Sequence, residues 1–113
     1  ARSRVADMPV VDVERESRFL EEVKRLVLAS VEGYACQVFL FGSRVQGRIK
    51  RSSDFDIGIT GLAQPDFNAV KRKIEELVEE SPVPHDIDVV NFDSAEEAFK
   101  NIALREISVW KNA

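Results

Sequence analysis

Cysteine, histidine and long apolar runs are all scarce in this sequence, and each scarcity excludes a class of protein. The chain has one Cys and one His among its 113 residues. The single Cys36 excludes an intrachain disulfide and a cysteine-based zinc site, so we expect a reducing, cytoplasmic setting. The longest apolar runs, among them 38–41, are far shorter than the roughly 20 residues that a membrane-spanning helix needs. The first ten residues are mixed and charged, so no secretory leader is expected.

An excess of basic residues is also missing. The net charge is −4, which argues against the extended basic surface that binds duplex DNA or RNA. One short segment reverses this balance, because residues 42–53 contain four basic residues and no acidic one. An acidic chain with one basic, glycine-containing segment favours a small polyanion site over a nucleic-acid track.

What is present is the composition of one globular domain. Apolar residues make up 44% of the chain and charged residues 32%, and 113 residues suffice for one core. We therefore expect a single domain over 1–113, with residues 1–12 as a flexible N-terminus. The expected elements are a helix over 13–31, a strand over 35–41, a turn or short helix over 43–48, a strand over 54–60, a helix from 65, a strand over 86–92 and a helix from 94.

The last helix is predicted from a capping box. Ser94 and Glu97 have the spacing at which an N-cap serine and a glutamate three residues later satisfy each other's backbone groups. Its expected packing face consists of Ala98, Phe99, Ile102, Ile107 and Trp110. The whole order predicts an α/β domain with a small mixed sheet, and the strand order stays open.

Asp54 and Asp56 lie two residues apart in an alternating strand, so both side chains leave the same face. Carboxylates at that separation can bind divalent cations, and an oxygen-only ligand set suits Mg²⁺ or Mn²⁺. An isolated pair of this kind is more commonly exposed to solvent. Asp88 strengthens the functional interpretation, because it interrupts the apolar residues of the last strand and needs a partner or a metal there.

Asp88 could complete a triad if its strand lies beside the one over 54–60, and it could also serve as a general base. Asp86, two residues earlier on the same face, competes for this role. The alternative is that Asp88 only accepts backbone hydrogen bonds at a bend.

The third feature is the segment Gly42-Ser43-Arg44, directly after a buried strand. Glycine lets a phosphate approach the backbone, serine adds a hydroxyl donor, and Arg44 can add a bidentate contact to the same anion. The lysine ending of a Walker A loop is missing.

Together these features resemble a known family. Gly42-Ser43, ten intervening residues, Asp54-Phe55-Asp56 and a later Asp88 in an apolar strand are similar to the minimal nucleotidyltransferases, the MNT group of the DNA polymerase β-like superfamily. The stretch reads GSRVQGRIKRSSDFDIGI. The resemblance implies the polymerase β-like α/β (α+β) fold, a short mixed sheet with helices packed mainly on one face.

The resemblance also implies a chemistry. Gly42 and Ser43 would hold the β- and γ-phosphates, Asp54 and Asp56 would bind two divalent cations, and Asp88 would bind one of them and help deprotonate the acceptor. An acceptor hydroxyl would attack the α-phosphate of ATP or another NTP and release pyrophosphate. In the MNT group the implied partner is a HEPN-domain ribonuclease toxin, and the MNT protein is an antitoxin that transfers AMP to one of its tyrosines.

Two other functions remain open at this stage. The chain could be a non-catalytic module that only docks onto a HEPN protein. It could also be a nucleotidyltransferase for small molecules such as aminoglycosides, working as a homodimer. The sequence does not decide whether the chain forms a homo-oligomer.

Overall fold

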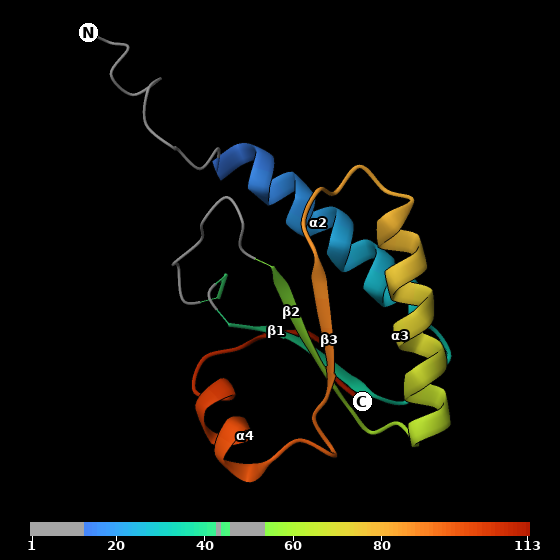
Figure 1. Ribbon diagram of the computed structural model, residues 1–113, viewed down its shortest axis with the longest axis vertical. Coiled ribbons are helices and arrows are strands. Elements are labelled where there is room, and N and C mark those ends of the chain that lie inside the picture. Colours follow the sequence, from blue (N-terminus) through green and yellow to red (C-terminus); the bar gives the residue numbers. More distant parts are fainter. Residues whose placement is uncertain (1–12, 43, 46–53) are drawn as a thin grey trace, which may run out of the picture.

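Four strands form one mixed sheet at the centre of the computed structural model, which describes residues 13–42, 44–45 and 54–113 (Figure 1). The expectations for 1–12, for Ser43 and for 46–53 lie outside the described residues. The strands are β1 (Gln37–Phe41), β2 (Phe55–Thr60), β3 (Ile87–Asn91) and β4 (Ser108–Lys111). Their order is β3-β2-β1-β4, in which β2 and β3 are parallel and β1 is antiparallel to both of its neighbours. The prediction of a small mixed sheet is confirmed.

Two long helices cover one face of the sheet. They are α2 (Val13–Ser30) and α3 (Gln64–Glu79), close to the predicted ranges, and they also pack against each other (Figure 1). Their apolar stripes meet the inward-facing strand residues in the main core, whose members include Val23, Val27, Phe55, Ile57, Ile59, Phe67, Ile74 and Val89. Among the described residues, no helix combines the length and the apolar character that a bilayer crossing requires.

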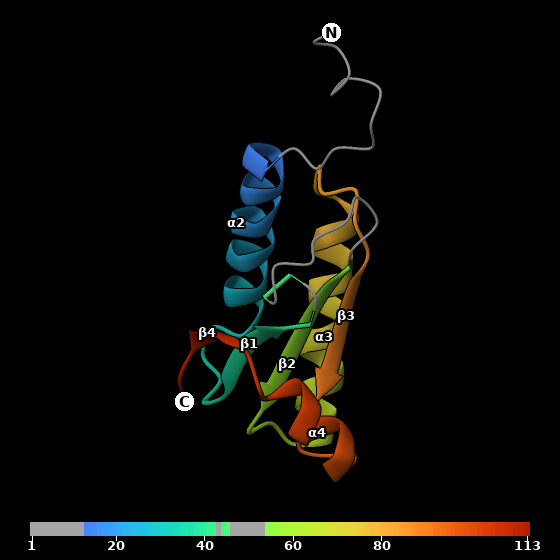
Figure 2. The same ribbon diagram turned by 90° about the vertical axis from the view of Figure 1, so that its left-hand side faces the viewer.

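The opposite face carries a smaller aromatic cluster. Phe39, Phe41 and Phe92 are buried there. The Phe92 ring meets Phe39 and Phe41 edge to face, with centroids 4.8 and 5.2 Å apart, and the Phe39 and Phe41 rings are tilted to each other at 6.2 Å. Short helix α4 (Glu97–Ala103) lies over this face, in front of the sheet in Figure 2 with α3 behind. Gly58 is the strand position that admits these rings, because a Cβ there would lie 2.5 Å from Phe39 and 2.8 Å from Phe92.

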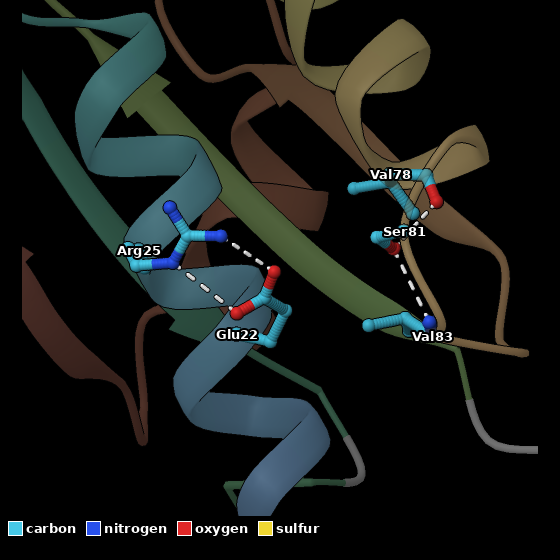
Figure 3. Close-up of polar contacts among 5 residues, drawn as sticks. All are labelled: Glu22, Arg25, Val78, Ser81 and Val83. Atoms are coloured by element: carbon cyan, nitrogen blue, oxygen red, sulfur yellow. Dashed lines mark hydrogen bonds and ion pairs between the residues drawn. The ribbon is translucent and has the colours of Figure 1, made fainter.

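The turn between α3 and β3 is held by one serine (Figure 3). The Ser81 hydroxyl donates to the carbonyl of Val78 at 2.7 Å and accepts from the amide of Val83 at 3.2 Å. Val83 is buried in the main core. These bonds direct the chain from the end of α3 toward the start of β3. Figure 3 also shows the Glu22–Arg25 ion pair on the exposed side of α2.

The predicted C-terminal helix is wrong in its start and in its extent. The helix begins at Glu97 after Glu96, whose side chain makes no capping hydrogen bond, and the Ser94 hydroxyl donates to the carbonyl of Asn91 in the preceding turn. Residues 108–111 form β4, which adds an edge strand beside β1. The predicted packing face is accordingly divided: Trp110 packs on the main core, Ile107 joins the aromatic cluster, and Phe99 and Ile102 are exposed by 41% and 59%.

Residues 108–111 form a strand because β1 would otherwise have one side without a hydrogen-bonding partner strand. The short stretch Ser108–Lys111 satisfies that side with backbone hydrogen bonds, and this gain outweighs continued helix for so short a segment. Helical spacing of apolar residues is therefore a weaker guide here than the open strand edge.

Candidate active site

Three chain segments meet at one end of the sheet, where β1 ends and both β2 and β3 begin (Figure 1). Asp56 on β2 pairs with Phe41 on β1 and with Asp88 on β3. Residues that pair directly in neighbouring strands send their side chains to the same face. Asp56 and Asp88 thus lie side by side, on the face opposite the main core. The condition set by the sequence, that the strand of Asp88 lies beside β2, is confirmed.

Gly42 lies against the Asp56 carboxylate. Its φ of +86° lies in the left-handed region that favours glycine. A Cβ at this position would collide with Oδ2 of Asp56 and would lie 3.1 Å from its Cγ. Glycine is therefore required twice, once for the backbone turn after β1 and once for the space that the carboxylate occupies.

The carboxylates disturb one another electrostatically. Burial, then the charge of Asp88, then that of Asp54 raise the pKa of Asp56 to about 6, while the charge of Arg44 acts in the opposite direction. Desolvation is the largest cause of this shift, and the neighbouring negative charges add to it. The site is one that a cation would stabilise.

The remaining acidic residues lie near this pair. Asp54 is exposed and directly precedes β2, and Asp88 is exposed on β3. Asp86 is also exposed, and its backbone carbonyl accepts a hydrogen bond from the Phe55 amide at 3.1 Å. The residue that pairs with Asp56 is Asp88, which favours Asp88 over Asp86 for the predicted role.

The donor set fits a hard divalent cation in its chemistry, because it offers carboxylate oxygens only. In 13–42, 44–45 and 54–113, no three His, Cys, Asp or Glu side chains come together as a ready metal-binding group. Asp56 and Asp88 are therefore the assembled part of the site.

The Arg44 side chain is buried against the main core, although its position after the glycine turn suggested an exposed anion-binding residue. Its side chain is only 3% exposed, and its guanidinium lies 3.9 Å from the centre of the Phe55 ring, a residue of the main core. Nη1 donates to Glu16 at 2.8 Å, and Nε donates to the Asp54 carbonyl at 3.2 Å. The expected contact between Arg44 and a phosphate stays a prediction.

Sequence reasoning missed Glu16, which accepts a hydrogen bond from Arg44, and His85, which contacts Glu16. Glu16 contacts Nε2 of His85 at 3.1 Å. These partners are 28 and 69 residues apart in the chain, so no local pattern could have joined them.

Comparison with known proteins identifies the family. Residues 32–112 match the family described as polymerase beta, nucleotidyltransferase. The chain belongs to the polymerase β nucleotidyltransferase family. The match spans the glycine turn, β2 and β3, and it therefore contains the end of the sheet described above.

Individual relatives agree with this assignment. The chain is 33% identical over 94 residues to a protein of Haemophilus influenzae named "Probable protein adenylyltransferase MntA", covering 83% of this chain and 79% of that protein. A crystal structure of a toxin–antitoxin with AMP-PNP superposes with a TM-score of 0.61 at 19% identity, covering 80% of this chain and 73% of that one. A mutant of the MntA–HpeT toxin–antitoxin gives 0.59 at 17% identity, with the same coverages. These structures share the fold of this nucleotidyltransferase.

Proposed function

We propose that this nucleotidyltransferase is an antitoxin that transfers AMP from ATP to a tyrosine hydroxyl of a HEPN-domain toxin in the cytoplasm. The observation that carries the proposal is the direct pairing of Asp56 with Asp88 beside Gly42. The relative named as a protein adenylyltransferase and the toxin–antitoxin neighbours support the acceptor class. The AMP-PNP in one neighbour supports an adenine nucleotide as donor.

The residues of the site divide the chemistry among themselves. Gly42 has no side chain between the backbone and the carboxylates, so phosphates can approach its turn, where Ser43 would add a hydroxyl donor. Asp88 is exposed beside Asp56 and would accept the proton of the attacking hydroxyl. The hydroxyl oxygen forms a bond to the α-phosphorus, the bond to the β-phosphate oxygen breaks, and pyrophosphate leaves.

Asp54, Asp56 and Asp88 would hold the divalent cations, two Mg²⁺ or Mn²⁺ ions. When bound, such ions neutralise the charge that develops on the transferred phosphoryl group. The raised pKa of Asp56 supports this assignment, because crowded carboxylates favour a proton or a cation between them.

The decisive experiment combines the purified chain, ATP, Mg²⁺ and a candidate HEPN protein. We expect the HEPN protein to gain the mass of one or more adenylyl groups, as measured by intact-protein mass spectrometry. Asp56→Asn and Asp88→Asn should abolish the gain. Asp66→Asn, which changes an exposed aspartate on α3, serves as the matched control and should transfer AMP like the wild type. Transfer to an aminoglycoside but to no protein would overturn the proposed acceptor.

A docking function without catalysis has one supporting observation. Four large apolar side chains are exposed on α4, β4 and the segment between them: Phe99 (41%), Ile102 (59%), Leu104 (46%) and Val109 (44%). Exposed apolar side chains gathered on neighbouring segments are typical of protein interaction sites. A HEPN partner that binds tightly, stays unmodified with ATP and Mg²⁺, and is inhibited equally by Asp56→Asn would favour docking alone.

A further inference from the structure

A largely buried polar cluster lies at the same end of the sheet as the candidate active site. It consists of Glu16, Arg44 and His85. Their side chains are 13%, 3% and 9% exposed. One Glu16 oxygen accepts from Arg44 at 2.8 Å, and the other contacts His85 at 3.1 Å. Burial acts to raise the pKa of Glu16, but the hydrogen bonds from Arg44 and His85 and their charges outweigh burial and lower it. Glu16 therefore carries its negative charge at neutral pH.

This cluster joins four segments of the chain through Phe55. The Arg44 guanidinium stacks over the Phe55 ring at 3.9 Å, and the His85 ring meets the same ring edge-on at 5.8 Å. Arg44 also donates to the Asp54 carbonyl, while the Phe55 amide donates to the carbonyl of Asp86. The first turns of α2, the turn after β1, the start of β2 and the entry to β3 are thus held together.

The same segments carry the residues of the proposed reaction. Gly42 lies two residues before Arg44, Asp54 and Asp56 flank Phe55, and Asp88 lies three residues after His85. The cluster itself lies on the other side of the sheet, because Phe55 belongs to the main core and Asp56 points away from it. Its polar groups therefore act on the carboxylate face through the backbone and, for Arg44, through its charge, which lowers the pKa of Asp56.

We propose that Glu16, Arg44 and His85 are positioning residues that set the relative places of the glycine turn and the carboxylates of β2 and β3. This inference rests on the proposed function and deepens it. It also assigns Arg44 a positioning role in place of the expected phosphate contact. The Arg44 guanidinium donates to the Glu16 carboxylate and the Asp54 carbonyl and stacks on the Phe55 ring. Removing the Glu16 charge should then disturb the site although Glu16 lies across the sheet from the Asp56–Asp88 pair.

The test compares Glu16→Gln and Arg44→Lys with the double variant. Glu22→Gln is the matched control, since it removes a carboxylate from an ion pair with Arg25 on the exposed side of the same helix (Figure 3). Each variant is assayed for kcat and for KM of ATP at saturating Mg²⁺, well below its melting temperature. Free Mn²⁺ measured by electron paramagnetic resonance gives a readout that does not depend on turnover.

For both single variants we expect kcat to fall about tenfold to a hundredfold and the Kd for Mn²⁺ to rise about tenfold, the range for residues that orient metal ligands. KM for ATP should change by less than about threefold, because ground-state nucleotide binding is not what the cluster supplies. The double variant should lose no more kcat and Mn²⁺ affinity than the more strongly impaired single variant, because both changes break the same cluster. Glu22→Gln should match the wild type.

Two results would overturn the inference. A raised KM in Arg44→Lys together with a normal Glu16→Gln would make Arg44 a phosphate ligand. A lowered melting temperature in Glu16→Gln with unchanged kcat and Mn²⁺ affinity would make the cluster purely structural. If the wild type transfers AMP to no acceptor, the proposed function fails, and Mn²⁺ binding still decides the positioning role. If Glu16→Gln does not fold, His85→Gln, which removes both ring contacts, takes its place with the same readouts.

Discussion

Replacing Gly42 with Ala should separate backbone strain from damage to the site. Gly42 has a φ of +86°, and a left-handed backbone costs an L-residue about 1–2 kcal/mol. The added Cβ would also collide with Oδ2 of Asp56, and its distance to Cγ would be 3.1 Å. The atom in the way is the end of a rotatable side chain, so we expect the carboxylate to move and the turn to stay.

Gly33 is a matched control within the same chain. Its φ is +91°, and a Cβ added there would meet no atom within 4 Å. Gly33→Ala and Gly42→Ala should therefore lose a similar free energy of unfolding, about 1–2 kcal/mol, from strain alone. In a domain of this size that corresponds to a drop in melting temperature of about 4–10 °C.

Catalysis should distinguish the two variants. A carboxylate displaced by about 1 Å can cost about a hundredfold in rate, so Gly42→Ala should lose most AMP transfer while Gly33→Ala keeps it. Thermal unfolding and initial rates of transfer, both measured with the same preparations, give the comparison. Equal rates in the two variants, at equal losses of stability, would refute the idea that Gly42 makes room for Asp56.

Three further changes test the electrostatics and the packing. Because the pKa of Asp56 is raised from 3.8 to about 6, its contribution to stability is fully present below pH 3.8 and is lost as the pH rises through about 6. Asp56→Asn should therefore stabilise the metal-free protein above pH 6, by on the order of 1 kcal/mol for a half-exposed group, and urea titrations showing the same difference at pH 4 and pH 7 would contradict this. Gly58→Ala should cost about 1–3 kcal/mol by overpacking Phe39 and Phe92, seen as a lower urea midpoint, and an unchanged midpoint would mean that the rings adapt freely. Ser81→Ala should cost about 1 kcal/mol through the lost turn bonds, and a wild-type melting temperature would count against their role.

Local periodicity was a good guide to most elements of this chain. In the structure, Phe55, Ile57 and Ile59 lie in the main core and Asp56 lies on the other face, in agreement with the alternation over 54–60. It works because successive strand residues must point to opposite sides, whatever the strand packs against. The apolar stripes of α2 and α3 were predictable for the same reason, because 3.6 residues per turn place every third or fourth residue on one face.

The C-terminal segment was not predictable in this way. Ile107 and Trp110 have helical spacing from Phe99, yet residues 108–111 pair with β1 as an edge strand. An unpaired strand edge arises only once the sheet has formed, and its hydrogen bonds are worth more to four residues than a continued helix.

By itself, the sequence determined the class of the domain and the residues worth testing, because spacing and residue chemistry are local properties. The pairing of Asp56 with Asp88 and the burial of Arg44 between Glu16 and Phe55 were decided by the tertiary structure. The Asp56–Asp88 and Arg44–Glu16 contacts join residues 28 or more positions apart, and they follow from how the whole sheet and α2 pack together.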